Sequence, residues 1–169
     1  FAEMFGFRQV VESGDFTKSI TEPLSFPEKD NVKFVLLEMD EQQQLLEFMA
    51  QSFPGRWTFE AHDYFAQGGT GRDYVVVKWE GKIVGFCRIN DEYSAWKGPN
   101  YNWAEQFDQL GGIGPLGVNE DYRKYGLGRA VIEAAEFYLQ QRGKKTFFID
   151  WTDLIAFYEK LGYTVWKNY

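Results

Sequence analysis

The stretch that decides the fold of this chain is residues 114–131, GPLGVNEDYRKYGLGRAV. Residues 112–118 are apolar, few in number and bounded by turn residues, which predicts a strand. Pro115 lies inside this strand. Because proline has no N–H to donate to a ladder, we expect the strand to bulge or to lose its partner there. A loop over residues 119–125 then leads into a predicted helix.

The predicted helix has one apolar face. Its apolar residues follow one another at spacings of four, three and four, as Leu127, Val131, Ala134 and Tyr138. The polar residues that fall elsewhere are expected to be solvated: Glu133, Glu136 and Gln140. Gly143 is expected to end the helix as a glycine just beyond its last turn.

The turn between this strand and this helix has the chemistry of a diphosphate cradle. Gly126 and Gly128 lack a Cβ, so a ligand can approach the backbone closely. The first N–H groups of a helix have no intrahelical partner, and the helix dipole adds positive potential there. Three cationic side chains lie in the same segment: Arg123, Lys124 and Arg129. The segment is therefore predicted to bind phosphate groups, although a lone Gly-x-Gly would also fit a tight connection with a packing glycine.

Two motifs resemble the signature of the GCN5-related N-acetyltransferase (GNAT) superfamily. The first is RKYGLG at residues 123–128, which matches the Gln/Arg-x-x-Gly-x-Gly/Ala motif for acetyl-CoA and follows a strand that ends in PLGV. The second is FYEKLGY at residues 157–163, in the expected order and at the expected spacing. The resemblance is sharp over residues 112–163 and rests on the order of elements alone over residues 31–90.

The resemblance implies an α+β fold and a binding mode for acetyl-CoA. We expect a six- to seven-stranded mixed, mostly antiparallel sheet with helices on both faces and a splay between the two central strands. The pantetheine arm of CoA would enter the splay, and the amides after residue 123 would hold the diphosphate. The residues expected to bind CoA are Leu116, Gly117, Val118, Arg123, Lys124, Tyr125, Gly126, Leu127, Gly128 and Arg129.

The second motif suggests a catalytic acid but no catalytic base. Tyr158 matches the family tyrosine that protonates the leaving CoA thiolate, a sensible transfer because a phenol has a pKa of about 10 and a thiol one of about 8.5. The alternative is a core aromatic residue on a short helix. Asp108, Asp150, Glu120 and a water chain all remain open as the base. Trp151 stands where the family often has an asparagine that contacts pantetheine, which puts one CoA contact in doubt.

Composition narrows the class of protein. A chain of 169 residues suggests one domain, and a net charge of −7 argues against nucleic acid and favours cationic acceptors such as amines. One cysteine, Cys87, and one histidine, His62, argue against a disulfide and against a metal site. Cys87 is either an acyl-accepting nucleophile or a buried apolar residue, and His62 is either a base or a structural side chain. Without a long apolar run or a signal peptide, we expect a cytoplasmic protein with no membrane partner.

A domain boundary is predicted after residue 30. Residues 1–30 are interpreted as an N-terminal arm or the tail of a preceding unit, and residues 31–169 as the acetyltransferase domain. FAEMFGF at residues 1–7 parallels FYEKLGY, so this tail could belong to a preceding GNAT-like unit, with a homodimer or a pairing with that unit expected. A chance match and an extra edge strand over residues 7–11 are the alternatives. Residues 12–30 are polar and read as a linker or an ordered surface arm.

The middle of the chain is predicted to begin with a strand over residues 31–39. Two predicted helices follow: Asp40 caps the first, which Pro54 ends, and Thr58 caps the second. The later elements are a hairpin over 74–79 and 82–90, a strand over 146–150, a helix over 153–161 and a strand over 163–166. The aromatic and acidic loop over residues 91–111 either recognises the acceptor or is packed by its own side chains.

These features bear on three candidate functions. The first is an acyl-CoA-dependent N-acetyltransferase that moves an acetyl group from acetyl-CoA to a primary amine of a small molecule or peptide in a ternary complex. The second is a non-catalytic CoA-binding or regulatory domain, which the missing base and Trp151 favour. The third, a Rossmann-type nucleotide-binding fold, needs alternating strands and helices, and the predicted hairpin contradicts it.

Overall fold

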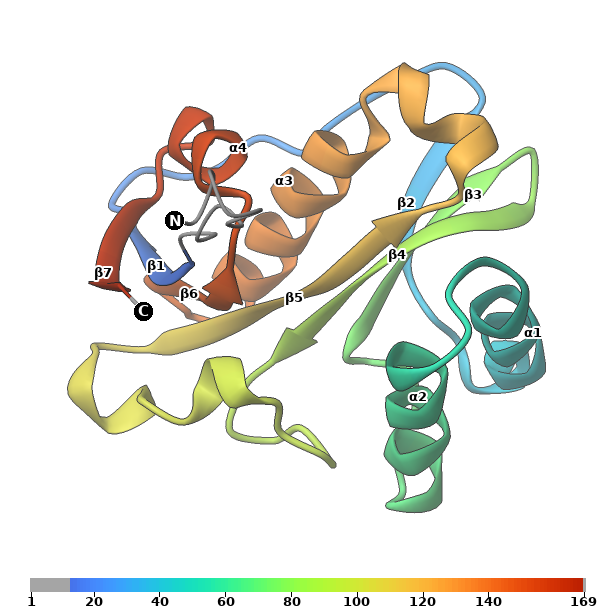
Figure 1. The fold of residues 1–169 in the computed structure, drawn as a ribbon, viewed down its shortest axis with the longest axis horizontal. Coiled ribbons are helices and arrows are strands. Elements are labelled where there is room, and N and C mark those ends of the chain that lie inside the picture. Colours follow the sequence, from blue (N-terminus) through green and yellow to red (C-terminus); the bar gives the residue numbers. More distant parts are fainter. Residues whose placement is uncertain (1–12, 169) are drawn as a thin grey trace, which may run out of the picture.

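The computed structural model describes residues 13–168, which fold around a seven-stranded sheet (Figure 1). The order across the sheet is β2-β3-β4-β5-β6-β1-β7, and β5 and β6 are parallel whereas the other neighbours are antiparallel. The strands are β1 (Gly14–Ser19), β2 (Val32–Leu36), β3 (Tyr74–Trp79), β4 (Lys82–Asn90), β5 (Leu110–Val118), β6 (Thr146–Thr152) and β7 (Thr164–Asn168). The expected α+β fold with a mostly antiparallel sheet is confirmed.

Helices cover both faces of this sheet. Helix α3 packs with α4 in one buried cluster, and α1 packs with α2 in a second cluster on the opposite face (Figure 1). The helices are α1 (Gln42–Ser52), α2 (Arg56–Ala66), α3 (Leu127–Gln141) and α4 (Ile155–Lys160). Four 3-10 turns within the described residues complete the connections: Met39–Glu41, Pro99–Tyr101, Ala104–Gln106 and Glu120–Tyr125.

The two central strands separate where the proline predicts a break. Residues 110–112 of β5 pair with residues 146–148 of β6, and the ladder between the two strands ends there. The pairing of β5 with β4 is irregular at the same place, because Cys87 faces Leu116 while Ile89 faces Ile113. Gly114 and Pro115 therefore form a bulge, and β5 and β6 diverge beyond it. The expected splay is confirmed.

Short-range turn predictions hold at the hairpin and at the end of α3. Glu80 and Gly81 have φ angles of 49° and 86°, which is the backbone that a two-residue hairpin loop requires. Gly143 has a φ of 86° directly after α3. Residue types alone predict these two turns, because the backbone conformation of each turn depends on the residues next to it in the sequence.

The predicted helix caps are wrong. Glu38, not Asp40, caps the 3-10 turn that leads into α1. The Glu41 side chain accepts a hydrogen bond from the backbone N–H of Glu38, which completes a capping box. Thr58 lies inside α2, and its hydroxyl donates to the carbonyl oxygen of Phe53 at 2.8 Å. Both helices therefore begin about two residues from the predicted caps, a common error at helix ends.

The expectation of a linker or surface arm over residues 12–30 is wrong for residues 14–19. This segment forms β1, which lies between β6 and β7, and Phe16 is fully buried in the core. The motif at residues 1–7 and the edge strand predicted over 7–11 lie outside the described residues. An origin of the N-terminal segment in a preceding unit stays a prediction.

Glu136 is buried rather than solvated, which corrects another expectation. Its side chain accepts a hydrogen bond from the Tyr163 hydroxyl at 2.7 Å and pairs with the Lys18 ammonium at 3.1 Å. Burial raises the pKa of this carboxyl, and the two partners oppose that shift. The contacts join α3 to β1 through Lys18, so this carboxylate anchors the N-terminal strand.

We expect Glu136→Leu to lower the free energy of unfolding by about 3 kcal/mol, because it leaves a part-buried ammonium and a buried phenol without their partner. Urea denaturation measures the change. Glu133→Gln is the matched control on the same helix. Because the Glu133 side chain is half-exposed, this substitution should change the free energy of unfolding by less than about 0.5 kcal/mol. Equal stability of the two variants would show that the buried carboxylate does not hold β1.

Candidate active site

A cavity of about 660 Å³ lies over the bulge where β5 and β6 separate. Gly114 and Pro115 line it from β5, and Asp150 and Trp151 line it from β6. The other lining residues come from β1, α2, β4 and the loop after β4: Asp15, Arg56, Trp57, Glu60, Arg88, Asn90, Trp96, Gly98, Pro99, Asn102 and Trp103. The splay thus opens onto a space that six parts of the chain enclose.

The lining of this first cavity is aromatic and acidic. Four of the six tryptophans of the chain line it: Trp57, Trp96, Trp103 and Trp151. Three carboxylates and two guanidinium groups join them: Asp15, Glu60, Asp150, Arg56 and Arg88. Indole faces and carboxylates both attract cations, so the first cavity suits a ligand that carries an amine.

Asp150 is the candidate base that lines the first cavity. Burial raises the pKa of its carboxyl, and the negative charge of nearby Asp15 raises it further, while Arg56 opposes the shift. Asp108 and Glu120, which the sequence left open for the same role, are exposed and do not line the first cavity. The structure therefore brings one of the three candidate bases to the splay.

Arg88 forms a cationic part of the wall. It is almost fully buried, and its guanidinium lies over the rings of Tyr64 and Trp96 at 4.5 and 5.3 Å. One nitrogen donates to Oδ1 of Asn90 at 3.1 Å and also to the carbonyl oxygen of Trp96, whereas Nε has no hydrogen-bond partner among the described residues. The contact with Trp96 ties the loop after β4 to the sheet.

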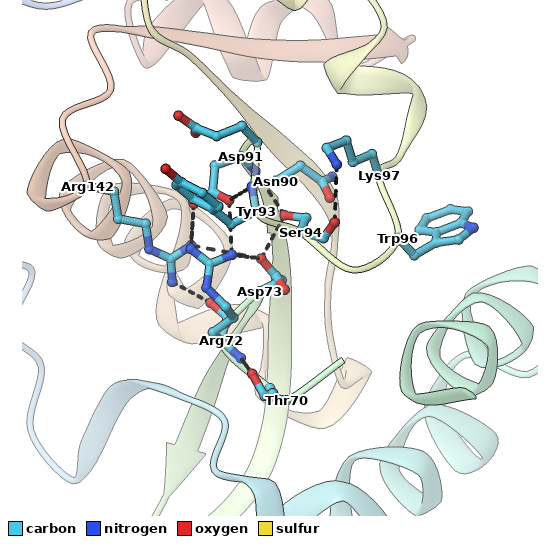
Figure 2. A network of polar contacts seen from close by, with 12 residues as sticks. Thr70, Arg72, Asp73, Asn90, Asp91, Tyr93, Ser94, Trp96, Lys97 and Arg142 are labelled. Atoms are coloured by element: carbon cyan, nitrogen blue, oxygen red, sulfur yellow. Dashed lines mark hydrogen bonds and ion pairs between the residues drawn. The ribbon is translucent and has the colours of Figure 1, made fainter. Parts of the chain in front are cut away.

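A buried polar network fixes the start of that loop (Figure 2). Asp91 accepts two hydrogen bonds from the Arg72 guanidinium, at 2.6 and 3.0 Å, and a third from Arg142 at 3.2 Å. Ser94 donates to Asp73 at 2.8 Å and accepts from the Asp91 amide at 2.9 Å. Charge-assisted pairs of this kind are short and directional, so the loop leaves β4 in a defined path toward the first cavity.

The aromatic loop over residues 91–111 packs against the sheet and also lines the first cavity. Trp103 packs edge-on against Trp166 at 5.2 Å, and Phe107 packs against Phe148 at 5.8 Å. The same loop brings Trp96 and Trp103 to the first cavity. Packing and acceptor recognition are therefore compatible uses of one segment.

A second cavity of about 580 Å³ adjoins the first on the side of α4. Its lining residues are Ser13, Trp57, Leu116, Trp151, Thr152, Asp153, Leu154 and Tyr158. Tyr158 is 4% exposed, and burial is the main cause that raises the pKa of its phenol. A phenol whose pKa is raised stays protonated at neutral pH, as a proton donor must, although it is a weaker acid than a free phenol. The placement of Tyr158 beside the second cavity, and not the shift of its pKa, makes it a candidate proton donor.

The predicted diphosphate cradle is open at its glycines. Gly126 has a φ of 71° and precedes the first residue of α3, and a Cβ on Gly128 would meet no atom within 4 Å. Three residues of the cradle are exposed cations: Arg123, Lys124 and Arg129. The backbone N–H groups of the first helical turn can therefore be reached by an anion.

The remaining residues expected to bind CoA lie around this cradle. Arg123 Nε donates to the carbonyl oxygen of Val118 at 2.9 Å, and the Tyr125 ring packs at a tilt against Trp79, with 4.8 Å between the ring centroids. Leu127 is fully buried, so it can offer a ligand its backbone and not its side chain. Gly117 packs against Phe53, because an added Cβ would lie 2.5 Å from that ring. Leu116 lines the second cavity.

Sequence reasoning missed the N-terminal contributors to the site. Asp15 and Ser13 line the two cavities, and the Lys29 ammonium would lie 3.4 Å from a Cβ on Gly126, where it adds a cation to the cradle. These residues belong to a polar segment without a recognisable motif, so no local signal points to them. Their place follows from the pairing of β1 with β6 and β7.

Neither Cys87 nor His62 lines the two cavities. Cys87 is fully buried, and burial raises its pKa to about 12, so its thiol is not a nucleophile at neutral pH. His62 lies exposed on α2 and does not line either cavity. Residues 13–168 contain no cluster of three potential metal ligands, and none of their helices is long and apolar enough to cross a membrane.

Comparison with known proteins establishes the family. A family model described as "Acetyltransferase (GNAT) family" matches residues 42–163, which include both motifs and most of the sheet. The chain belongs to the GNAT family. The cradle before α3, the splay between β5 and β6 and the second motif on α4 are thus parts of a GNAT domain.

Individual relatives are distant. An uncharacterized N-acetyltransferase of Chlorobaculum tepidum is 29% identical over 92 residues, which are 54% of this chain and 50% of that protein. A solved glucosamine N-acetyltransferase region of a fungal multi-domain β-N-acetylglucosaminidase has a TM-score of 0.79 at 22% identity, over 94% of this chain and 20% of that one. A GCN5-related N-acetyltransferase of Sphaerobacter thermophilus has a TM-score of 0.70 at 17% identity, over 99% of this chain and 52% of that one. The chain spans half the length of the curated relative. The two solved structures have the same fold as this chain.

Gly128→Glu is expected to weaken acetyl-CoA binding at least about 100-fold, because a carboxylate beside a diphosphate costs several kcal/mol. The substitution should leave the fold intact, since the space beside Gly128 is open. Calorimetric titration measures the affinity. Gly128→Ala is the control: alanine occurs at this position of the family motif, so this variant should retain binding. Equal affinities of the two variants would contradict the assignment of the cradle.

Proposed function

We propose that this GNAT domain is an acyl-CoA-dependent N-acetyltransferase that moves an acetyl group from acetyl-CoA to a primary amine by direct attack in a ternary complex. The observation that carries the proposal is the meeting of two cavities in the splay between β5 and β6. Asp150 lies in the first cavity and Tyr158 in the second. A carboxylate that would act as the base and a phenol that would act as the acid thus line the two cavities on either side of the proposed place of acyl transfer.

Acetyl-CoA would bind along the bulged strand. Its diphosphate would lie on the N–H groups around Gly126 and Gly128, with Arg123, Lys124 and Lys29 nearby. Its thioester would reach the splay beside Leu116, in the second cavity, where a backbone N–H after the bulge would polarise the carbonyl group. Positioning of this kind supplies much of the rate of a reaction between two bound substrates.

The transfer itself needs two proton movements once the bound ammonium has lost its first proton to water. The neutral amine loses a second proton as its nitrogen attacks the carbonyl carbon, and Asp150 would accept that proton. As the C–N bond forms and the C–S bond breaks, the sulfur leaves with the electron pair, and Tyr158 would donate a proton to it. The tryptophans around both cavities would limit the access of water, which could otherwise hydrolyse the thioester.

The acceptor that this cavity favours is a small cationic amine. Amines are protonated in water, and the three carboxylates and four indoles of the first cavity would attract that charge. Amino sugars belong among the candidates, because the fungal region of similar fold is named as a glucosamine N-acetyltransferase. Exclusion of nucleic acid as a partner and a cytoplasmic location remain predictions from the sequence.

The test is a turnover assay with a panel of primary amines. Release of free CoA thiol from acetyl-CoA should depend on both protein and amine, and mass spectrometry should show the amine heavier by one acetyl group. The panel would contain amino sugars, polyamines, amino acids and a peptide with a free N-terminus. Thiol release without an acetylated amine would mean hydrolysis and would count against the proposal.

A non-catalytic CoA-binding domain is the second candidate. Trp151 favours it, because its indole is 68% exposed at the splay that the arm of CoA would enter. This alternative predicts tight binding of acetyl-CoA together with no turnover on any amine. The two functions therefore differ in turnover and not in affinity.

A further inference from the structure

Two tryptophans stand at the junction of the two cavities. Trp57 and Trp151 are the residues that line both of them. The order along the strands is the same on each side of the splay. On β5, Pro115 lines the first cavity and Leu116 the second, and on β6, Asp150 lines the first and Thr152 the second. The cavities are therefore successive sections of one cleft, and the two tryptophans line the passage where the sections meet.

Trp151 has an unusual backbone conformation. Its φ of 33° falls in the left-handed region, which a bulky residue rarely adopts and which costs free energy. The pairing of β1 with β6 is irregular here, because Gly14 faces Thr152 while Phe16 faces Ile149. The extra residue in β6 turns the Trp151 side chain out of the ladder and toward the cleft, where it is 68% exposed.

The N-terminal strand holds Trp151 in this conformation at two points. Oδ1 of Asp15, a residue that is 2% exposed, accepts a hydrogen bond from the Trp151 amide at 2.7 Å. The Ser13 hydroxyl oxygen accepts one from the indole Nε1 at 2.9 Å. An exposed indole gains little from burial, so these contacts orient the ring and do not serve the core.

We propose that Trp151 limits the length of the acyl group that this domain transfers, with Trp57 as the opposite wall of the passage. The inference rests on the proposed function. The thioester sulfur would lie on the Tyr158 side and the attacking amine on the Asp150 side, so the acyl carbonyl must lie in the passage. The carbon chain of a longer acyl group would then lie against the indole, whereas an acetyl methyl group fits.

The test compares acetyl-CoA with butyryl-CoA in the intact chain and in Trp151→Gly. Glycine removes the indole and adopts a positive φ without strain, so this variant should fold. We expect the ratio of kcat/KM for butyryl-CoA over acetyl-CoA to rise at least tenfold. The ratio of the two association constants, measured by calorimetry, should rise in the same direction. Ser13→Ala, which frees the ring without removing it, should give a smaller increase.

Trp103→Ala is the control, because Trp103 lines the first cavity and not the second. It should change the KM for the amine and leave the acyl preference unaltered. If Trp151→Gly does not fold, Trp151→Asn carries the same test, since asparagine also tolerates a positive φ.

The outcomes separate this inference from the function on which it rests. Acetyl transfer by the unmodified chain with an unchanged acyl preference in the folded Trp151 variant would overturn the inference and leave the function standing. A non-catalytic domain that binds acyl-CoA would still reveal the preference in its affinities. Failure of the unmodified chain to bind any acyl-CoA would overturn both.

Discussion

Replacing Tyr158 with phenylalanine is expected to lower kcat for acetyl transfer about 100-fold or more, the usual contribution of a general acid. The variant keeps the ring, which packs against Phe16, Phe157 and Tyr163, and removes the hydroxyl alone. Affinity for acetyl-CoA should change little, because the thiolate that needs the proton exists only after the amine attacks. Initial rates of thiol release, with calorimetry on the same samples, separate the two quantities.

Tyr163→Phe is the matched control for Tyr158→Phe. Tyr163 lies in the same aromatic cluster, and its hydroxyl donates to Glu136 and lines neither cavity. Its loss should lower stability and leave kcat close to that of the unmodified chain. If the two variants lost turnover equally, damage to the cluster and not loss of an acid would explain the effect.

Replacing Asp150 with asparagine is expected to lower kcat/KM by about 100-fold at neutral pH and to change its dependence on pH. A base acts in its ionised form, so the rate of the unmodified chain should rise with pH through the pKa of Asp150. Burial and Asp15 raise that pKa above the ordinary carboxylate value, so the acidic limb should appear at a higher pH than for an exposed aspartate. In Asp150→Asn this limb should disappear.

Asp15→Asn tests the assignment of Asp150 as the base by changing the pKa of Asp150 without replacing it. It removes a negative charge near Asp150 and keeps an oxygen that can accept the Trp151 amide. The pKa of Asp150 should fall, because a like charge no longer opposes its ionisation, and the acidic limb should move to lower pH. A limb that stays in place in Asp15→Asn, or that persists in Asp150→Asn, would assign the base to another group or to water.

The parts of the fold that could be predicted from the sequence depend on local patterns. The break at Pro115, the hairpin at Glu80 and Gly81 and the end of α3 at Gly143 each follow from residue types within a few positions. The cradle between β5 and α3 carries a motif that one family shares. Those features need no knowledge of distant segments.

The parts that could not be predicted depend on contacts between distant segments. β1 is polar apart from Phe16, and its partners in β6 and β7 lie more than a hundred residues away, so no periodicity marks it as a strand of this sheet. Glu136 lies off the apolar face of α3 as expected, yet Lys18 and Tyr163 cover it. Asp15 and Ser13 reach the cleft for the same reason, so the contribution of the N-terminal segment to the cleft has no signature in the sequence.

A crystal structure of the chain with bound CoA would test the central claim most directly. We expect the diphosphate on the N–H groups around Gly126 and Gly128, and the sulfur in the second cavity within about 3.2 Å of the Tyr158 hydroxyl, the reach of a hydrogen bond. The first cavity, with Asp150, should remain open to an amine on the other side of Trp151. A sulfur atom that lay away from both Tyr158 and the splay would contradict the assignment of acid, base and transfer site together.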